Sequence, residues 1–281
     1  MQRQRFKMIT LTPKKDFQFP IIAECVNPDV FHGKAIKEIE ELKIWEGNKQ
    51  KTLKELFKVE ETRTENPQEK EVITINGNIS KVRRIGASMK SGEIIIHGDV
   101  GMHLGEEMKG GKITVYGNVG GWAGSMMKGG TIEIHGNASD YLGAPYRGSS
   151  EGVRDGKIVV YGNVGNEAGA YMKNGLIKIY GNAGQFVGLR MRDGTILVEK
   201  DSSGRVGACM KGGKIVVGGS LESVLPTFTI DSIKEKVKIE EGETVTGPFY
   251  LFLGDLVENG EGKLYVSKEK NPHLSHYERL L

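Results

Sequence analysis

The sequence repeats itself every 19 residues through most of its middle. A glycine closes each short apolar alternation, and Gly98, Gly117 and Gly136 are spaced 19 residues apart. The whole column is Gly77, Gly98, Gly117, Gly136, Gly162 and Gly181, followed by Lys200 and then Gly219. Such self-similarity indicates a solenoid, because a unit this small buries its apolar face only by stacking on its neighbours.

Two further columns keep the same period. One is a second glycine: Gly86, Gly105, Gly124, Gly143, Gly169, Gly188 and Gly207. The other is methionine: Met89, Met108, Met127, Met172, Met191 and Met210, with Tyr146 as the one substitute. Three columns in step predict about seven coils.

Each coil opens with a short strand. Apolar, mostly β-branched residues alternate with other residues, as at Ile113 and Val115, and a Gly-Asn corner follows. A period of two is typical of a strand. Stacked Asn side chains, such as Asn118 and Asn137, are expected to form an amide ladder. We therefore predict an all-β fold, a parallel β-helix. A left-handed hexapeptide helix uses coils of about 18 residues, and 19 does not divide by six, so we expect the right-handed form.

The repeat divides the chain into three parts. We expect an N-terminal capping or docking segment at 1–70, the β-helix domain at 71–220 and a C-terminal capping or docking segment at 221–281. Residues 61–71 read as a polar linker, 249–253 as a short strand and 274–281 as an amphipathic helix. A solenoid needs caps because its terminal coils otherwise expose strand edges.

Composition excludes several classes of function. The 39 Lys and Arg against 36 Asp and Glu give a net charge of +3, which does not indicate nucleic acid or membrane binding. Two cysteines, Cys25 and Cys209, do not form a CxxC site or an iron–sulfur ligand set. We expect a cytoplasmic protein without a membrane span.

The residue after each methionine position is basic. These residues are Lys90, Lys109, Lys128, Arg147, Lys173, Arg192 and Lys211, here called the basic ladder. Like charges at this spacing repel one another, which favours a stripe that meets an anionic partner or ligand. The alternative is a solvated corner whose long stems cover the methionine beneath.

The fourth coil carries seven extra residues within Gly143–Gly156, here called the insertion loop. Insertions in solenoids become loops on one face. Tyr146, Arg147, Glu151, Arg154 and Asp155 make this loop the best local candidate for a contact, and a plain surface insertion is the alternative.

A third candidate surface is the outward column before the anchor glycines. Its members are Asn76, His97, Tyr116, His135, Tyr161, Tyr180 and Glu199, and Ile95, Val159, Leu197 and Val216 also face outward by parity. This strip indicates either a protein interface or simple ladder stacking. His97 and His135 are two coils apart, roughly 9–10 Å, which is too far to share one zinc.

The sequence lacks the motifs of common catalytic sites. We find no nucleophile elbow, no HExxH motif and no Ser/His/Asp set, and the glycine-rich strings lack a strand–GxGxxG–helix context. We therefore predict no catalytic, cofactor-binding or metal-binding residues in this chain. The candidate contacts are Tyr146, Arg147, Arg154, Lys109, Lys128, Lys173 and Arg192.

The coils GKITVYGNVGGWAGSMMKGG and GLIKIYGNAGQFVGLRMRDG, with GAPYRGSSEGVRDG between them, resemble the C subunit of formylmethanofuran dehydrogenase from methanogenic archaea. The segments NPDVFHGK and NPHLSHYERLL are also similar to that protein. A more distant likeness is to the glycine-repeat β-helix at the C-terminus of the large glutamate synthase subunit.

The resemblance implies a noncatalytic subunit of a complex that reduces CO2 and formylates methanofuran, the first step of methanogenesis. It implies pterin-binding, amidohydrolase-like and ferredoxin-like partner subunits that hold a tungsten- or molybdenum-pterin, Fe–S clusters and a dinuclear metal site. The basic ladder is then a candidate contact for the acidic tail of methanofuran.

Three alternatives stay open. The first is a formyltransferase/hydrolase complex without redox activity. The second is a standalone β-helix enzyme on an anionic substrate, which calls for clustered carboxylates that the sequence lacks. The third is the architecture of glutamate synthase, in which such a domain separates two active sites.

Overall fold

The computed structural model describes residues 6–64 and 70–281. Its strands are β1 (Phe6–Pro13), β2 (Ile21–Ile22), β3 (Lys43–Glu46), β4 (Lys49–Thr52), β5 (Phe57–Thr64), β6 (Val72–Asn76), β7 (Val82–Arg83), β8 (Glu93–His97), β9 (Lys112–Val115), β10 (Lys128–Ile134), β11 (Asp155–Val160), β12 (Leu176–Ile179), β13 (Thr195–Val198), β14 (Lys214–Val217), β15 (Thr229–Glu240), β16 (Glu243–Gly254) and β17 (Gly262–Ser267). The helices are α1 (Pro28–Phe31), α2 (Ile36–Glu40), α3 (Leu53–Leu56) and the 3-10 helices η1 (Leu256–Glu258) and η2 (Pro272–Leu280).

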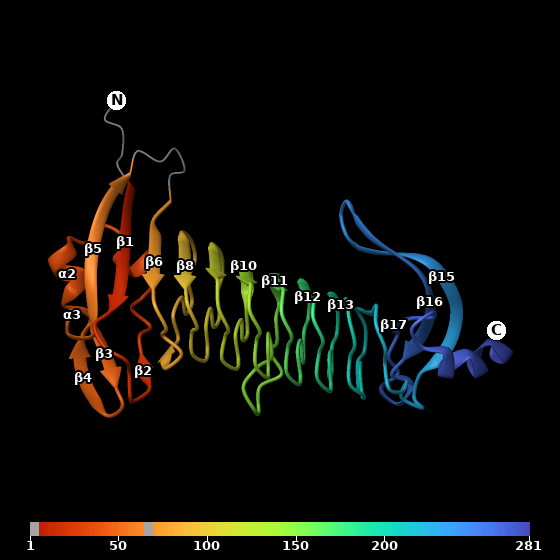
Figure 1. Cartoon of the computed structure of the whole chain (residues 1–281). Coiled ribbons are helices and arrows are strands. Elements are labelled where there is room, and N and C mark those ends of the chain that lie inside the picture. Colours follow the sequence, from red (N-terminus) through yellow and green to blue (C-terminus); the bar gives the residue numbers. More distant parts are fainter. Residues whose placement is uncertain (1–5, 65–69) are drawn as a thin grey trace.

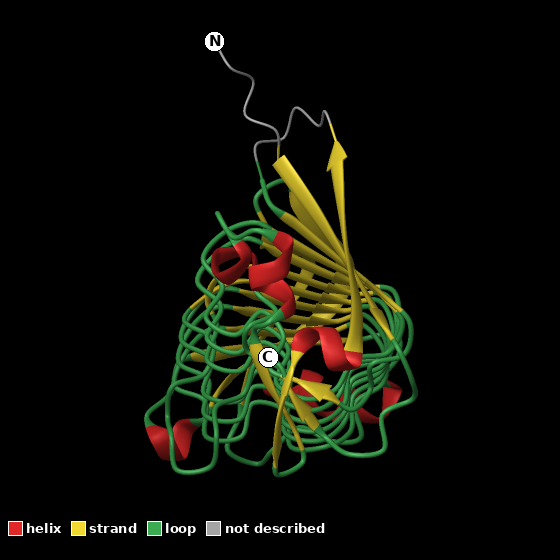
Figure 2. Cartoon of the chain, turned by 90° about the vertical axis from the view of Figure 1, so that its left-hand side faces the viewer, coloured by secondary structure: helices red, strands yellow, loops and turns green. Residues whose placement is uncertain are grey.

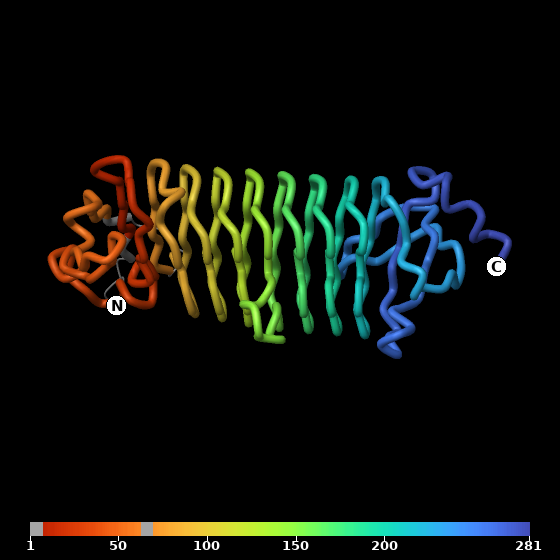
Figure 3. Tube along the Cα trace, turned by 90° about the horizontal axis from the view of Figure 1, so that it is seen from below, coloured from red at the N-terminus to blue at the C-terminus, as the bar shows by residue number. Residues whose placement is uncertain are grey.

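A 13-stranded sheet runs the length of the molecule (Figure 1). Its middle consists of β6, β8, β9, β10, β11, β12, β13 and β14, which pair in parallel and in chain order. Equivalent residues of successive coils face each other, as Ile113 faces Ile132. The predicted apolar columns are confirmed, and Figure 3 shows the successive coils side by side.

A second ladder of parallel bridges runs through the coils away from the main sheet. It joins Ile79, Val100, Val119, Ala138, Val164, Ala183, Ser202 and Leu221 in that order. The view along the stack shows strands on one side and turns around the rest of each coil (Figure 2). Ile, Val, Leu, Ala and Met columns fill the interior, and Met108, Met127 and Met172 are fully buried.

The two glycine columns have different structural causes. A Cβ on Gly117 would lie 2.4 Å from the carbonyl oxygen of Gly98, so the anchor column allows close approach of neighbouring coils. Gly105 has φ +62°, and a Cβ there would lie 2.6 Å from Ile132 Cδ1. The second column therefore combines left-handed backbone with a filled core.

The corner amides form the predicted ladder between coils. The Asn118 side-chain oxygen accepts a hydrogen bond from the Asn137 backbone N–H at 2.9 Å and from its side-chain amide at 3.1 Å. Asn163 and Asn182 each donate their backbone N–H to the preceding rung at 2.8 Å. The expectation of an amide ladder is confirmed.

Both flanking segments add strands to the same sheet. β1 pairs in parallel with β6 and antiparallel with β5, and β17 pairs in parallel with β14. β16 then pairs antiparallel with both β17 and β15. A four-stranded sheet, β4-β3-β2-β7, lies beside the N-terminal coils. The sheet edges are thus extended by the chain's own ends.

Of three predictions about the flanks, the linker was wrong in part, and the strand and the helix are present with a different length or type. Residues 61–64 are not linker but the end of β5, because they pair with β1; positions 65–69 lie outside the described residues. The short strand expected at 249–253 is part of the twelve-residue β16. The C-terminal helix is present, but it is the 3-10 helix η2.

Candidate partner-binding surfaces

Backbone hydrogen bonds show which residues occupy the basic ladder. The N–H of Lys128 donates to the carbonyl of Met108 at 2.7 Å, and equivalent bonds connect the other coils. In the fourth coil, Arg154 donates to Met127 at 2.8 Å, and Lys173 donates to Val153 at 2.7 Å. Val153, which is fully buried, therefore replaces the methionine, and Arg154 provides the basic rung.

The assignment of Tyr146 and Arg147 to these two columns was wrong. The extra residues of the fourth coil precede Val153. One 19-residue period after Met127 therefore ends at Tyr146, in the insertion loop, before the chain returns to the stack. The loop protrudes from the edge of the molecule in Figure 3. Arg154 stays a ladder residue, whereas Tyr146 and Arg147 belong to the loop.

Carboxylates interrupt the basic ladder. Lys128 pairs with Glu107 at 2.7 Å, and this hydrogen bond lowers the pKa of Glu107. Glu151 bonds Lys173 at 2.5 Å and also Arg154, and these two contacts lower its pKa to about 2. The ladder is therefore charge-compensated at its middle rungs, which reduces the repulsion between neighbouring cations.

Among the described residues, three exposed rungs lack such compensation: Lys90 and the predicted contact residues Lys109 and Arg192. None of the three forms a salt bridge with any residue in the described ranges. Lys109 and Arg192 are therefore the predicted contacts on the ladder whose charge is most available to a partner.

The insertion loop is tied to the body of the stack by Tyr146. Its hydroxyl donates to the carboxylate of Glu106 and lies 3.3 Å from His103 Nδ1. Glu106 is only 3% exposed, and Arg84 Nε lies 3.2 Å from its second oxygen. Burial is the main cause that raises the pKa of Tyr146, and burial also lowers the pKa of His103. The sequence did not predict this contact, because Tyr146 lies two coils after Glu106 along the chain and Arg84 lies one coil before it.

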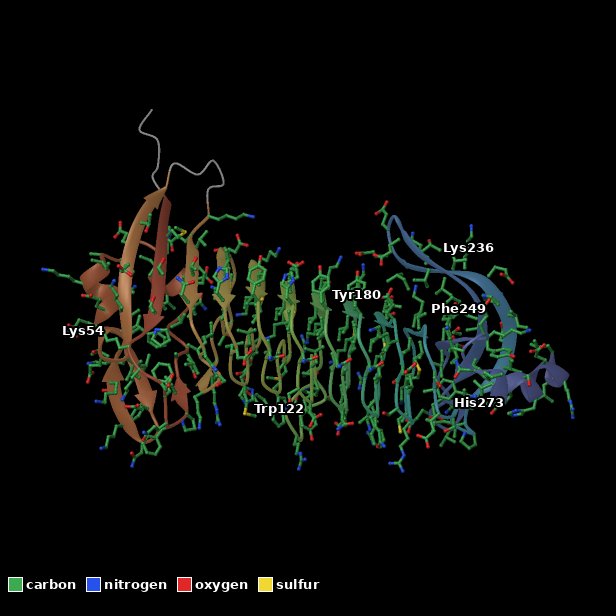
Figure 4. The ribbon with its side chains drawn as sticks, in the orientation of Figure 1. Lys54, Trp122, Tyr180, Lys236, Phe249 and His273 are labelled. Atoms are coloured by element: carbon green, nitrogen blue, oxygen red, sulfur yellow. The ribbon has the colours of Figure 1, made fainter. Side chains whose placement is uncertain are left out.

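The outward aromatic column is present and continuous. Ring centroids are separated by 5.1 Å (His97–Tyr116), 4.6 Å (Tyr116–His135), 4.8 Å (His135–Tyr161) and 5.2 Å (Tyr161–Tyr180), all stacked. Tyr116 is 54% exposed, so the column remains at the surface. Figure 4 shows Tyr180 near the ends of the strands.

The apolar part of the same strip is not an open interface. Leu197 and Val216 are buried against Val237, Ile239 and Phe249 of the β15–β16 hairpin. The hairpin curves over this end of the sheet in Figure 1. The chain itself covers the outward apolar residues of β13 and β14, so the alternative of an interface with another protein is wrong for these residues.

Lys178 fixes the tip of this hairpin. Its side chain is 5% exposed and bonds both Glu240 and Glu243, which flank the hairpin turn. Lys157 also pairs with Glu240, at 2.8 Å. Sequence reasoning missed this cluster, since the charges on β11, β12 and the hairpin are far apart along the chain.

The described residues provide neither a metal cluster nor a membrane-spanning helix. Within residues 6–64 and 70–281, no group of three or more His, Cys, Asp or Glu side chains has a metal-binding arrangement. Across the same ranges, no helix has the length and apolar character needed to cross a bilayer. Cys25 and Cys209 are free thiols, and burial raises the pKa of Cys25 to about 12.

Comparison with known proteins gives a full-length relative. The C subunit of the tungsten-containing formylmethanofuran dehydrogenase 2 of Methanococcus maripaludis is 48% identical over 272 residues, covering 95% of this chain and 98% of the relative. The C subunit of the molybdenum-containing formylmethanofuran dehydrogenase 1 of Methanothermobacter thermautotrophicus is 46% identical over 94 residues. That alignment spans 34% of this chain and only 22% of the relative. No protein-family model matches the chain.

A solved structure is similar over almost the whole chain. It is the formyltransferase/hydrolase complex FhcABCD of Methylorubrum extorquens in complex with methylofuran, and the TM-score is 0.79 at 28% identity. The match covers 92% of this chain and 99% of the compared chain. With the end-to-end relative from Methanococcus maripaludis, these similarities show that the chain belongs to the family of formylmethanofuran dehydrogenase C subunits.

Proposed function

We propose that this chain is a noncatalytic, structural subunit of a formylmethanofuran dehydrogenase complex, which reduces CO2 and formylates methanofuran at the start of methanogenesis. The observation that carries the proposal is the 48% identity with the C subunit of a tungsten-containing enzyme over 95% of this chain and 98% of that one. The regular stack offers a long rigid surface, which suits a scaffold.

The proposed architecture is a right-handed parallel β-helix at 71–220, with capping or docking segments at 1–70 and 221–281. The two parallel ladders, one in the main sheet and one through Val100, Val119 and Ala138, support closed coils. Connections between parallel strands of one sheet are almost always right-handed, which supports that hand.

The proposed partners are pterin-binding, amidohydrolase-like and ferredoxin-like subunits in the cytoplasm. They would hold a tungsten- or molybdenum-pterin, Fe–S clusters and a dinuclear metal site, while this chain would hold none of them. Support comes from the relatives, whose names give molybdenum or tungsten, and from the multisubunit complex of the structural neighbour. The proposed contacts are Tyr146, Arg147, Arg154, Lys109, Lys128, Lys173 and Arg192.

One alternative also has a specific observation in its favour. The structural neighbour belongs to a formyltransferase/hydrolase complex, so a subunit role in a complex without redox activity is the second candidate. The dehydrogenase is preferred because its relative is 48% identical, whereas the structural neighbour is 28% identical.

The test is anaerobic purification of the tagged chain from its native source, followed by gel filtration, mass spectrometry and metal analysis. Recovery with a pterin-binding subunit and stoichiometric tungsten or molybdenum supports the dehydrogenase. Recovery with formyltransferase and amidohydrolase-like subunits without pterin supports the alternative. Recovery of the chain alone contradicts both proposals.

A further inference from the structure

One corner of every coil places a residue other than glycine in left-handed backbone. These residues are Arg84, His103, Trp122, Tyr141, Glu167, Phe186 and Arg205, with φ between 59° and 67°, here called the corner row. They occupy equivalent positions, because Trp122 N–H donates to Asp140 and Tyr141 N–H to Asn166, one coil further on. Figure 4 shows Trp122 at the lower edge of the stack.

Neither the backbone nor the core explains these residue types. Left-handed backbone favours Gly and Asn, and it is an outlier for bulky side chains. The same coils do use glycine two residues later, as at Gly105 and Gly124. All seven corner-row residues stay partly or fully exposed, so they do not fill the interior. Strained positions of this kind point to a role at the surface.

The corner row forms an aromatic surface beside the insertion loop. The ring centroids of Trp122 and Tyr141 are 4.4 Å apart, and those of His103 and Tyr146 are 5.3 Å apart. A cavity of about 220 Å³ lies between the row and the loop, and Trp122, Tyr141, Tyr146, Tyr171, Leu189 and one carboxylate, Glu167, are among the residues that line it. A cavity of roughly 150 Å³ already holds benzene, so this one accommodates a single large apolar side chain.

Three exposed guanidinium groups surround the aromatic surface. Arg190 lies over the ring of Tyr171 at 5.7 Å, and Arg205 lies over Phe186 at 5.1 Å. Arg147 donates to the hydroxyl of Tyr141 at 3.5 Å. In the described part of the chain, none of the three forms a salt bridge with a carboxylate. Because contacts with rings orient these side chains, their N–H groups are ready to bind carboxylates.

We propose that the corner row and the insertion loop dock an acidic loop of a partner subunit. One large apolar side chain of that loop enters the cavity, and its carboxylates pair with Arg147, Arg190 and Arg205. Tyr, Trp and Arg around a pocket are the composition of interface hot spots. This inference rests on the proposed membership in a multisubunit complex, and it names one docking surface and its partner chemistry.

The test uses a variant that the backbone tolerates. Phe186→Asn combined with Arg205→Asn removes a ring and a guanidinium, and Asn accepts left-handed φ. The full-length chain is bound to the partner subunits of its complex, purified free of this chain, and the dissociation constant is measured by biolayer interferometry. We expect binding at least tenfold weaker, with the melting temperature of the isolated chain within a few degrees of wild type.

Ser88→Asn is the matched control, since Ser88 is exposed and has φ 56° but lies at the N-terminal end of the stack. We expect it to leave binding unchanged. As a second readout, a photo-cross-linking benzoylphenylalanine at Phe186 is expected to capture a partner peptide that contains Asp or Glu. Cross-links only between two copies of this chain, or to a basic peptide, would overturn the proposal.

The outcomes separate this inference from the proposed function. If the wild-type chain binds the partner subunits and the double variant binds equally well, the docking surface is wrong and the subunit role stands. If the wild-type chain does not bind them at all, both proposals are wrong.

Discussion

At the residue scale, each coil requires glycine at two points for two different reasons. Gly117 lacks space for a Cβ, which would lie 2.4 Å from the Gly98 carbonyl oxygen, whereas Gly105 combines a close contact with left-handed backbone. The 19-residue period indicates that glycine is needed at both positions, but it does not distinguish the reasons. The backbone φ angle tells these cases apart, since Gly105 has φ +62° and Gly117 is not left-handed.

Gly117→Ala tests the close approach alone, because Gly117 does not have left-handed φ. The added methyl group would clash with backbone atoms, which cannot rotate away as a side chain can. We therefore expect a loss of about 1–3 kcal/mol in the free energy of unfolding. Gly204→Ala is the matched control, since its nearest neighbour would be the flexible Glu222 side chain at 3.4 Å. Urea denaturation measures both, and equal stability of the two variants contradicts the explanation.

Tyr146 was placed in the wrong column because a sequence count does not show where an insertion leaves the stack. The structure places its hydroxyl on the buried Glu106 instead. Tyr146→Phe removes one hydrogen bond to a carboxylate, and we expect a loss of about 2 kcal/mol. Hydrogen exchange should show faster exchange within 145–152, while Tyr161→Phe, whose bond to Glu133 is exposed and 3.3 Å long, leaves the loop protected.

At the element scale, the β15–β16 hairpin was the largest feature that the sequence did not predict. Short strands of the repeat are visible as columns, but β15 and β16 belong to no repeat, and residues such as Lys234, Glu235 and Lys236 mask their alternation. Which surface a hairpin covers depends on contacts between distant segments. The sequence of the strip at Leu197 and Val216 is therefore compatible with an interface, whereas in the structure the hairpin of the same chain covers these residues.

The ion pairs at the hairpin tip predict a pH dependence. Lys157 and then Lys178 hold the pKa of Glu240 at about 2, below its usual value of 4.5. A lowered pKa in the folded state means that the stabilisation is fully present above about pH 4.5 and is lost as the pH falls toward 2. The difference in unfolding free energy between wild type and Glu240→Gln should be clear at about pH 6 and vanish near pH 2.

Glu60→Gln is the control for this experiment, because Glu60 pairs with Lys58 at an exposed site away from the hairpin. We expect its effect on stability to be small at every pH. A difference between wild type and Glu240→Gln that stays constant from about pH 6 to about pH 2 would show that the ion pairs do not hold the hairpin.

At the scale of the whole molecule, the repeat was predictable and the sites were predictable only in part. Stacked columns such as Ile113 and Ile132 repeat one local rule, so the sequence indicates the stack directly. The positions of the basic ladder follow from the same repeat. Its ion pairs with Glu107 and Glu151 depend on where the side chains lie, which the repeat does not give. The corner row escaped detection because sequence does not show the sign of φ.

The uncompensated rungs lead to the last prediction. Lys109 and Arg192 are exposed and have no ion pair among residues 6–64 and 70–281, so a double Lys109→Glu and Arg192→Glu change reverses charge without removing an ion pair within that part of the chain. If the ladder meets an anionic surface of a partner, association with the partner subunits slows several-fold at low ionic strength. Raising the salt concentration should reduce the difference, since exposed charges are screened within about 10 Å at 0.1 M. A double Lys43→Glu and Lys49→Glu change at exposed residues of β3 and β4, which form no salt bridge within the described ranges, alters the net charge equally and is the control. Equal association rates for all three proteins would leave the ladder as a solvated corner.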